Sequence, residues 1–469
     1  TITRNYYRGN MVYPFIDQLQ EQLLIDSFSI FCGAGATADL TKRKWEDIFH
    51  EKTKMFYNAN LSNDIYLLSD LEKNYYNTNN FYSDIKSKLS FDGISRHIEC
   101  IIKLNLNHIW TTNFDEIIEN AIFKEYGVKP VVLSTSKDLL SKNLNVEHVV
   151  YKLNGTINDE NSMVLTKTDF FEYFKKQRLF FELLKRQLVL DSFLFVGYSF
   201  QDNLVLNALR EIKDVFPENG KTHYRFIIQE MSKKNTKEEL LKEEFIKYEQ
   251  QYFMDKYNIQ SILLNKFTDI DDYLSELYRR FCNHNILFCG SFRNIDNDLR
   301  IHIEQIVDTV IHELYQNRFN IYSGNGRGLG EIVVARAKLH SKMPFNRFIN
   351  RPLIFTGDPI EIKQEKNKRI EKDCNTMLIL CGQDESLSSS KNVHAQFERF
   401  ISDKDNNKLI IPIPSTGYAA KEIFESESYK NSYCYKIMQS ELKLLNSMKK
   451  PNEIAKLIVN LILRYRKEP

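Results

Sequence analysis

Paired cysteines are missing from this chain of 469 residues. Its seven cysteines are scattered singly, without a C-x-x-C pair, and Cys32, Cys289 and Cys381 each close an apolar run. An odd number of thiols in such positions predicts reduced, buried side chains in a cytoplasmic protein and excludes a disulfide framework or a structural zinc site. The sequence also has no H-x-x-x-H pair and no mixed cluster of histidine, cysteine and carboxylate residues, so we expect no metal.

Long apolar runs and an excess of one charge are missing too. No run approaches the roughly 18 apolar residues that a membrane-spanning helix needs. The chain has 64 Lys and Arg residues against 62 Asp and Glu residues, which leaves a formal net charge of +2. Residues 1–7 are polar and aromatic, unlike a signal peptide. A nearly neutral chain gives no support to a broad nucleic-acid or membrane surface, so we expect neither partner.

Glycine is scarce, with 16 residues, yet it gathers where apolar runs end. Residues 28–32 (FSIFC) lead into residues 33–37 (GAGAT), and residues 285–289 (NILFC) lead into Gly290 and Ser291. A further glycine-rich turn, residues 323–330 (SGNGRGLG), completes the second pattern. Each is typical of a buried parallel strand that opens towards a helix N-terminus, where backbone N–H groups approach a phosphate. One such turn is as often structural as functional, but two predict two nucleotide-type pockets.

The order of apolar runs and helical stretches predicts an α/β protein with two doubly wound, Rossmann-like parallel-sheet domains. The expected strands of the first half lie at residues 28–32, 108–110, 149–153, 192–196 and 259–264. Those of the second half lie at residues 286–289, 319–323, 352–355, 376–381 and 408–413. The pattern restarts after Asn283 and His284, so we expect domains at residues 1–283 and 284–469.

Three polar motifs follow strands in the first half, beside the 33–37 turn. They are Thr111-Thr112-Asn113-x-Asp115, Tyr151-Lys152-Leu153-x-Gly155 and Gly197-Tyr198-Ser199-x-x-Asp202. Ligands bind at the carboxyl ends of the strands in such sheets, so we expect the four turns to form one site.

In order and context, these four motifs resemble those of the sirtuin family, over about residues 1–283. The resemblance implies one NAD+ molecule, held as substrate by the four turns. It places Gly33, Ala34, Gly35 and Thr37 along the pyrophosphate, Asn113 and Asp115 near the nicotinamide ribose, and Gly197 with Ser199 at the ribose or adenine side, with Thr112 also in the NAD+ site.

The sequence departs from this resemblance at Asn154, which stands where sirtuins have a catalytic histidine. An imidazole accepts a proton near neutral pH, whereas a carboxamide only forms hydrogen bonds. Loss of a general base costs about 10²–10⁴-fold in rate. We therefore expect an NAD+ glycohydrolase that is impaired in this chain, with Asn113, Asn154 and Asp115 as the catalytic set. A catalytically silent nucleotide-binding receptor is the alternative.

Protein deacylation is less favoured by the sequence. Deacylating sirtuins carry a four-cysteine zinc module after the histidine motif. This chain has no cysteine between Cys100 and Cys282.

The second half resembles a SLOG domain, over about residues 284–469. The resemblance implies a regulatory nucleotide pocket, in which basic side chains meet phosphates and Glu398 accepts from a ribose hydroxyl. The expected residues are Gly290, Ser291, Gly326, Arg327, Gly328, Arg369, Lys391 and Glu398. A tight structural turn remains an alternative reading of these glycines. A phosphoribohydrolase is a further alternative, supported by the Gly330-Glu331 pair.

A sirtuin-like domain followed by a SLOG domain resembles the effectors of the Thoeris bacteriophage defence system. The resemblance implies a bacterial, cytoplasmic protein whose SLOG pocket senses a cyclic ADP-ribose isomer from a partner TIR-domain protein. The resemblance also implies that binding of this messenger activates NAD+ hydrolysis, and that the protein acts as a homo-oligomer, a tetramer or a larger assembly.

Overall fold

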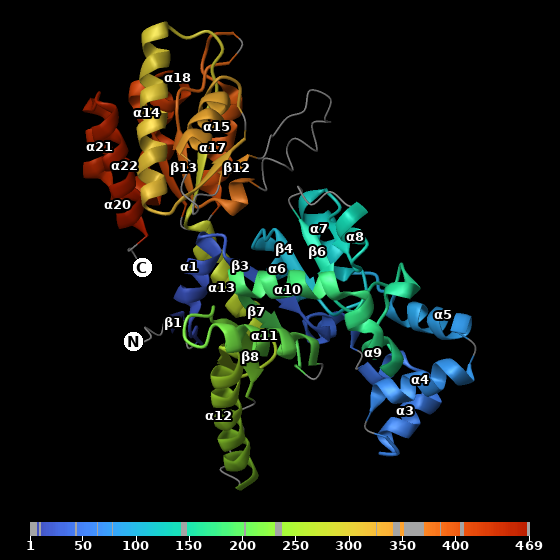
Figure 1. The fold of residues 1–469 in the computed structure, drawn as a ribbon. Coiled ribbons are helices and arrows are strands. Elements are labelled where there is room, and N and C mark those ends of the chain that lie inside the picture. Colours follow the sequence, from blue (N-terminus) through green and yellow to red (C-terminus); the bar gives the residue numbers. More distant parts are fainter. Residues whose placement is uncertain are drawn as a thin grey trace. The chain divides into compact units, whose positions relative to one another are not determined.

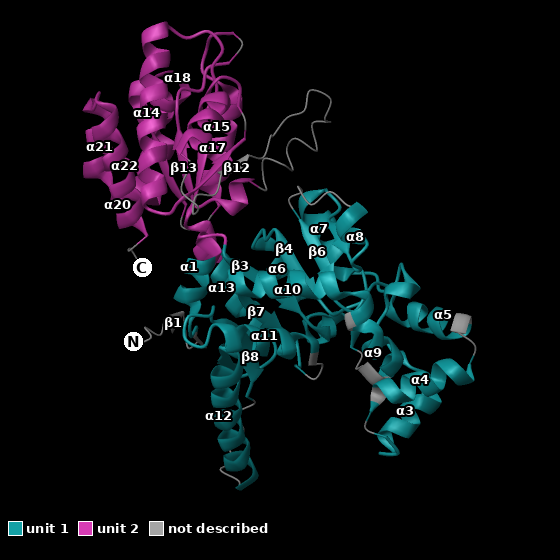
Figure 2. Cartoon of the chain, in the orientation of Figure 1, with its two compact units in different colours: residues 1–22, 27–278 teal, residues 23–26, 279–469 magenta. Residues whose placement is uncertain are grey.

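The computed structural model describes most of the chain and divides it into two compact units (Figure 2). Unit 1 holds residues 1–22 and 27–278, and unit 2 holds residues 23–26 and 279–469. The described residues are 7–8, 11–42, 45–62, 64–76, 78–141, 148–200, 203–229, 237–324, 326–340, 348–350, 370–384, 386–403 and 408–466.

The core of unit 1 is a seven-stranded, all-parallel sheet with the order β5-β6-β4-β3-β7-β8-β9 (Figure 1). Its strands are β3 (Phe28–Cys32), β4 (His108–Thr111), β5 (Val131–Leu133), β6 (Val149–Lys152), β7 (Ser192–Val196), β8 (His223–Ile228) and β9 (Ile259–Leu264). From β3 the chain adds β4, then the edge strand β5 and then β6 between them, before it crosses to the other side of β3 through β7. The strand order therefore reverses beside β3, and such a reversal is where doubly wound sheets bind ligands.

Thirteen helices are described between α1 and α13. They are α1 (Ile16–Leu24), α2 (Ala38–Thr41), α3 (Glu51–Asn58), α4 (Ile65–Tyr75), α5 (Thr78–Leu89), α6 (Arg96–Lys103), α7 (Ile117–Tyr126), α8 (Asp138–Ser141), α9 (Lys167–Lys176), α10 (Arg178–Leu190), α11 (Asn203–Val215), α12 (Lys237–Tyr257) and α13 (Asp269–Cys282). A small hairpin, β1 (Tyr7–Arg8) with β2 (Met11–Val12), precedes them.

Helices α3, α4, α5 and α9 form a helical module at one side of the unit 1 sheet (Figure 1). A second apolar core lies in this module and includes Phe49, Phe81 and Ile85. Phe114 and Ile157 belong to the same core, although they follow strands β4 and β6. The two strand-end loops that carry Asn113 and Asn154 are therefore anchored in the module by apolar neighbours.

Unit 2 contains a five-stranded, all-parallel sheet with the order β12-β11-β10-β13-β14. Its strands are β10 (Asn285–Cys289), β11 (Asn320–Ser323), β12 (Phe348–Asn350), β13 (Thr376–Ile379) and β14 (Leu409–Pro412). The two parallel sheets confirm the predicted fold class. The strand expected at residues 352–355 lies outside the described residues. The order reverses beside β10, the strand that precedes Gly290.

Helix α14 is the long helix of unit 2 and packs against α15 and α22 (Figure 1). The described helices after β10 are α14 (Asn297–Gln316), α15 (Leu329–His340), α17 (Lys391–Ser402), α18 (Tyr418–Glu425), α19 (Glu427–Lys430), α20 (Tyr433–Ile437), α21 (Gln439–Ser447) and α22 (Pro451–Tyr465). Asp296 caps α14 by accepting a hydrogen bond from the backbone N–H of Asp298 at 2.9 Å. Within the described parts of the chain, no helix is both long and apolar enough to cross a bilayer.

The seven cysteines are all buried and free of disulfide bonds. No group of three or more histidine, cysteine or carboxylate side chains that could hold a metal is found among the described residues. Burial raises the pKa of the Cys32 thiol, so this side chain is a packed apolar group and not a nucleophile.

A buried histidine makes the stability of unit 1 sensitive to acid. The Nδ1 atom of His223 accepts a hydrogen bond from the backbone N–H of Phe193 at 3.1 Å, so the ring is neutral. Burial, with a smaller contribution from Lys221, lowers the pKa of His223 from 6.5 to about 3. Between these pH values the unfolded state binds a proton that the folded state does not, so stability falls as the pH falls through this window.

We expect acidification from pH 8 to pH 5 to lower the free energy of unfolding by about 2 kcal/mol through His223. His223→Asn keeps an acceptor but does not titrate, so its unfolding free energy should change less between the two pH values. The measurement is urea unfolding followed by tryptophan fluorescence, since Trp45 and Trp110 are the two tryptophans and both belong to unit 1. His312→Asn, on the exposed side of α14, is the control. Equal acid sensitivity of wild type and His223→Asn contradicts the assignment.

Candidate functional site

The four sequence motifs of unit 1 meet at one edge of the sheet because their strands are in register. Cys32 at the end of β3 pairs with Thr111 of β4 and with Val196 of β7, and Thr111 pairs in turn with Lys152 of β6. Asn113 and Asn154 each lie two residues beyond the paired positions Thr111 and Lys152. The register therefore brings all four turns to the same carboxyl edge.

The turns after β3 and β7 are fitted to one another through glycine. The backbone N–H of Gly33 donates to the carbonyl of Val196, and that of Gly35 donates to the carbonyl of Gly197, both at 2.9 Å. Gly197 has a φ of +63°, and a Cβ atom there would lie 2.0 Å from the backbone nitrogen of Ala36. A side chain at this position is excluded by both space and backbone conformation.

Asn113 links the end of β4 to the glycine turn. Its Nδ2 atom donates to the carbonyl of Gly33 at 3.3 Å and to Oγ1 of Thr37 at 3.4 Å. Its backbone N–H donates to Oγ1 of Thr111 at 2.9 Å, and that hydroxyl in turn donates to the carbonyl of Cys32. Asn113 is buried, so these bonds fix the side chain beside the turn.

Asn154 holds a buried side-chain acceptor at this edge that lacks a hydrogen-bond partner among the described residues. The residue is 5% exposed, and its Oδ1 atom has no hydrogen-bond partner. Its backbone carbonyl accepts from the N–H of Val164 at 2.8 Å, so the loop itself is held in place. Buried polar atoms are almost always paired, so this oxygen is a candidate acceptor for a ligand hydroxyl group.

A buried lysine supports the loop that carries Asn113 and Asp115. Lys152 is fully buried, and its Nζ atom donates to the carbonyls of Phe114 and Asp115. The same Nζ atom lies 2.8 Å from Oε1 of Glu119 on α7. Sequence reading did not find this pair, since Lys152 lies inside a motif and Glu119 in a helix that carries no motif.

The Asp115 carboxylate is directed at the start of α7. Its Oδ1 atom accepts from the backbone N–H of Ile117 at 3.1 Å. Burial raises the pKa of Asp115, and the nearby Lys152 ammonium group opposes this shift. Burial likewise raises the pKa of Glu119, again against Lys152. Asp115 in the loop and Glu119 on α7 thus share one lysine, which favours the charged form of each.

The other expected NAD+ residues differ in exposure. Ala34 and Ser199 are exposed, and Thr112 is half-buried with its backbone N–H donating to the carbonyl of Cys32 at 3.2 Å. Residues 201–202, at the end of the Gly197 motif, lie outside the described residues. A cavity of about 250 Å³ adjoins these loops and is lined by Leu89, Ser90, Phe91, Asp92, Glu116, Asn120 and Ile157.

In unit 2 the glycine turns after β10 and β11 touch each other. Gly290 has a φ of +151°, and a Cβ atom there would lie 2.0 Å from the carbonyl oxygen of Leu380. A Cβ atom on Gly326 would lie 2.4 Å from the carbonyl oxygen of Gly290. Ser291 joins the turn that follows β13, since its Oγ atom donates to the carbonyl of Gln383 at 3.0 Å. Gly290, Ser291 and Gly326 are therefore brought together as expected.

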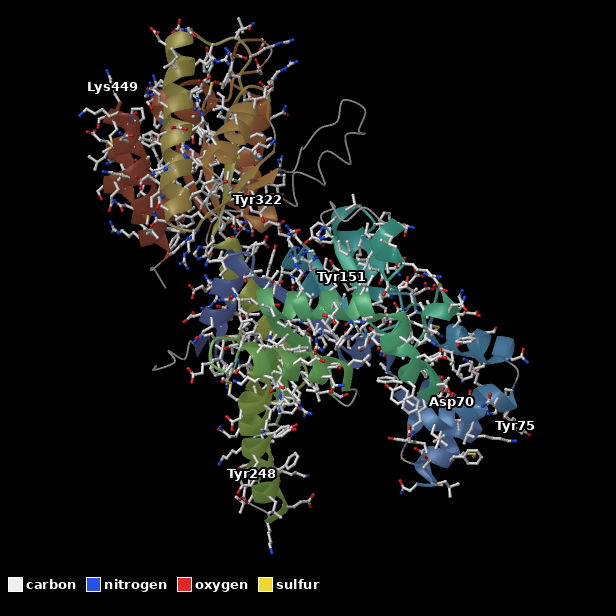
Figure 3. The ribbon with its side chains drawn as sticks, viewed as in Figure 1. Asp70, Tyr75, Tyr151, Tyr248, Tyr322 and Lys449 are labelled. Atoms are coloured by element: carbon white, nitrogen blue, oxygen red, sulfur yellow. The ribbon has the colours of Figure 1, made fainter. Side chains whose placement is uncertain are left out.

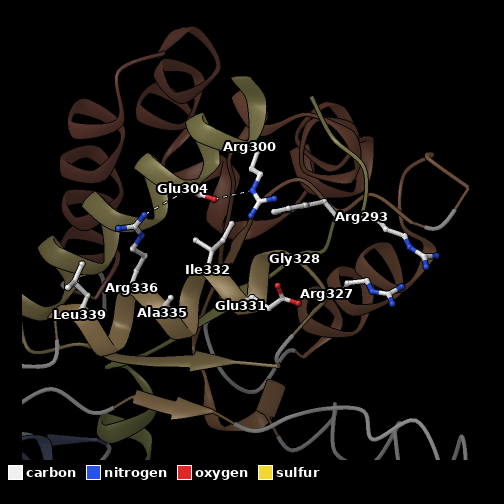
Figure 4. Close-up of a pocket in the computed structure, with 11 residues that line it drawn as sticks. Arg293, Arg300, Glu304, Arg327, Gly328, Glu331, Ile332, Ala335, Arg336 and Leu339 are labelled. Atoms are coloured by element: carbon white, nitrogen blue, oxygen red, sulfur yellow. Dashed lines mark hydrogen bonds and ion pairs between the residues drawn. The ribbon is translucent and has the colours of Figure 1, made fainter. Parts of the chain in front are cut away.

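Next to this turn lies a cavity of about 600 Å³ between α14 and α15 (Figure 4). Its charged lining residues are Arg293, Arg300, Glu304, Arg327, Glu331 and Arg336. Figure 4 shows Arg293 and Arg327 at one end and Arg336 at the other. The two arginines nearest Glu304, Arg300 and Arg336, pair with it at 3.1 Å and 3.8 Å.

Four guanidinium groups against two carboxylates make this cavity suited to an anion such as a phosphate. Gly328 also lines the cavity, so the cavity is continuous with the glycine turn. Of the arginines, sequence reading found only Arg327. Arg293 lies in the loop after β10, two residues beyond Ser291, whereas helix packing brings Arg300 of α14 and Arg336 of α15 to the cavity.

Of the three remaining residues expected in unit 2, two are exposed on α17 and one lies outside the described residues. Lys391 is exposed at the first position of α17, directly after Ser390, whose N–H donates to the carbonyl of Gly382 at 2.6 Å. Glu398 is exposed on the same helix and accepts from Oγ of Ser428 at 3.0 Å. Arg369 lies outside the described residues.

Comparison with known proteins finds two family models and several full-length relatives. Residues 107–262 match the SIR2-like domain, and residues 269–465 match the Sir2- and TIR-associating SLOG family. The chain is 26% identical over 443 residues to NAD(+) hydrolase ThsA of Bacillus cereus (strain MSX-D12), covering 90% of this chain and 91% of that protein. It is 23% identical to NAD(+) hydrolase ThsA of Enterococcus faecium, covering 95% and 97%. Defense-associated sirtuin 2 of Bacillus subtilis is 25% identical over 44% of this chain and 22% of that protein.

Proposed function

The chain is a ThsA-like protein, in which a SIR2-like domain precedes a SLOG domain, and on this premise we propose that it belongs to the NAD+ hydrolases of Thoeris antiphage defence. The observation that carries the proposal is the orphan Oδ1 atom of Asn154, in register with Asn113 at the edge where four turns meet. We place the hydrolase domain at residues 1–283 and the regulatory domain at residues 284–469.

The proposed reaction adds water across the bond between nicotinamide and ribose, which yields nicotinamide and ADP-ribose. The turn that contains Gly33, Gly35 and Thr37 receives the pyrophosphate, because glycine lets the phosphate oxygens approach the backbone. Asn113 and Asp115 orient the nicotinamide ribose and the attacking water. Asn154 accepts a hydrogen bond from a ribose hydroxyl through its Oδ1 atom. The proposed reaction uses no metal.

Asn154 limits this chemistry because a carboxamide cannot take up the proton that leaves the ribose hydroxyl or the water. The missing general base corresponds to about 10²–10⁴-fold in rate. We propose that this chain binds NAD+ and hydrolyses it slowly. The same observation favours the second candidate function, a catalytically silent receptor that assembles when its ligand binds.

We assign the regulatory pocket to the glycine turns of unit 2 and to the arginine-lined cavity beside them. Arg327 and Gly328 line both, and a cavity of about 600 Å³ has the size of a nucleotide site. The proposed ligand is a cyclic ADP-ribose isomer from a TIR-domain protein, whose two phosphates suit the arginines. The ligand activates only if it binds the active homo-oligomer more tightly than the resting form.

The test measures the two ligands separately by calorimetry on the full chain. Wild type should bind NAD+ and a cyclic ADP-ribose at different sites, so that saturation with one leaves binding of the other measurable. Arg327→Ala should weaken binding of the cyclic ligand about 10-fold or more, since a charge-assisted hydrogen bond contributes about 1.5–3 kcal/mol, and should leave the Kd for NAD+ unchanged.

Lys449→Ala, an exposed lysine in the loop before α22 of the same unit (Figure 3), is the matched control. Failure of wild type to bind NAD+ contradicts the proposed hydrolase. Failure to bind any cyclic ADP-ribose isomer contradicts the regulatory assignment alone.

A further inference from the structure

Helix α12 carries an apolar stripe that nothing in the described part of unit 1 covers. Leu241, Phe245, Tyr248 and Tyr252 are 56%, 65%, 68% and 48% exposed. Figure 1 shows the first part of α12 standing away from the unit 1 sheet, and Figure 3 places Tyr248 on that part. Single exposed apolar residues are ordinary, but a row of four large ones marks an interaction surface.

The last turns of α12 fix the helix to unit 1. Phe253 and Tyr257 are buried near its end. The guanidinium group of Arg225 on β8 lies 3.6 Å from the ring centroid of Phe253, and its Nη1 atom lies 3.3 Å from Oε1 of Glu249. The helix is therefore held in place by its last turns, and the exposed stripe belongs to a supported element.

The stripe has the spacing of a coiled-coil seam. Its four residues follow each other at intervals of four, three and four positions, from Leu241 to Tyr252. Apolar residues that alternate between these two intervals form one seam, which fits the seam of another helix. The occupant that this spacing favours is a second helix with the same pattern.

The charges beside the seam select how two copies of α12 would pair. In a parallel pair, each flanking residue faces the residue five positions later in the other helix. Lys237 would then face Lys242 of the second copy, and Glu244 would face Glu249 of the second copy. Both are like-charge contacts, and each occurs twice in a symmetric pair.

In an antiparallel pair these repulsions disappear. With Leu241 opposite Tyr252 of the second copy, and Phe245 opposite Tyr248 of the second copy, the flanking Lys242 faces Glu249 of the second copy. That carboxylate also pairs with Arg225 of its own chain at 3.3 Å, so it would lie between two cations. The symmetry of the pair repeats this opposite-charge contact. Charge complementarity therefore favours a second copy of this chain in the antiparallel orientation.

We propose that α12 is a self-association surface, through which two copies of the chain pair by an antiparallel contact of their Leu241–Tyr252 stripes. The stripe is about 16 Å long, at 1.5 Å per residue. A contact of this length is small, and it fits one interface of a larger homo-oligomer rather than a tight isolated dimer. The inference gives a location to the self-association proposed above and does not depend on either nucleotide site.

Disulfide trapping tests both the contact and its orientation. The antiparallel pair brings position 241 next to position 252 of the second copy, within the roughly 7 Å between Cα atoms that a disulfide spans. It holds equal positions about 16 Å apart. The double variant Leu241→Cys/Tyr252→Cys should therefore give a covalent dimer under mild oxidation, whereas each single variant should not. All seven native cysteines are buried, which keeps the background low.

The control is Lys247→Cys, an exposed position of α12 outside the stripe. Adding Phe245→Glu to the double variant should abolish trapping, and Phe245→Glu alone should shift the full chain to smaller species in analytical ultracentrifugation. Lys242→Glu should weaken association about tenfold, and Lys242→Arg should not.

Equal trapping of the single and double variants would overturn the antiparallel orientation. Trapping no better than that of Lys247→Cys, with a circular dichroism spectrum like that of wild type, would overturn the contact. Because these readouts require no NAD+ or cyclic nucleotide, their failure leaves the proposed hydrolase standing.

Discussion

Replacement of Asn154 by histidine should raise the rate of NAD+ hydrolysis by about 10²-fold or more. Asn154 already lies at the correct strand end, in register with Asn113, and its Oδ1 atom is a buried acceptor without a partner among the described residues. An imidazole at this position keeps a hydrogen-bond acceptor and adds a base whose ordinary pKa is about 6.5. The measurement is nicotinamide release from NAD+, with a cyclic ADP-ribose present to activate.

The pH profile separates a base from a merely better fit. The rate of the Asn154→His variant should rise as the pH increases through the pKa of the new imidazole and then level off. Asn154→Gln is the matched control, because it changes the side chain without adding a titratable group, and it should stay as slow as the parent chain. An Asn154→His variant that binds NAD+ as the parent does but hydrolyses it no faster contradicts the assignment of the base and favours the silent receptor.

Replacement of Lys152 by methionine should destabilise unit 1 by about 3–5 kcal/mol, because it leaves the buried Glu119 charge and two carbonyls without their cation. Lys152 is fully buried and lies 2.8 Å from Glu119. Urea unfolding followed by tryptophan fluorescence measures the change. Since Lys152 also holds the carbonyls of Phe114 and Asp115, the affinity for NAD+ should fall in the fraction that remains folded.

A second variant distinguishes the ion pair from general damage to the core. Lys152→Met/Glu119→Gln removes both charges and should be less destabilised than Lys152→Met alone, since no unpaired carboxylate stays buried. Lys176→Met, which removes the partner of Glu172 on the exposed face of α9, should change stability little. A double variant that is as unstable as the sum of its two single variants contradicts a direct coupling between Lys152 and Glu119.

How far the sequence predicts the site depends on how local each signal is. The strands β3 and β7 are continuous apolar runs followed by glycine, and each signal lies within about ten neighbouring residues. β5 has only three residues, and β8 is half-buried over its second half. Neither differs enough from a loop or a helix segment to be recognised, and the expected strand list omitted both.

The sequence by itself determined the two parallel sheets, the turns at their carboxyl edges and the asparagine at position 154, because each depends on residues that are adjacent in the chain. Only the tertiary structure decided the Lys152–Glu119 pair and the arginine cavity of unit 2. The same holds for the exposure of the α12 stripe. These features join residues that are distant in the chain or depend on which face of a helix is covered. Strand register and helix packing set both properties, and no local pattern encodes them.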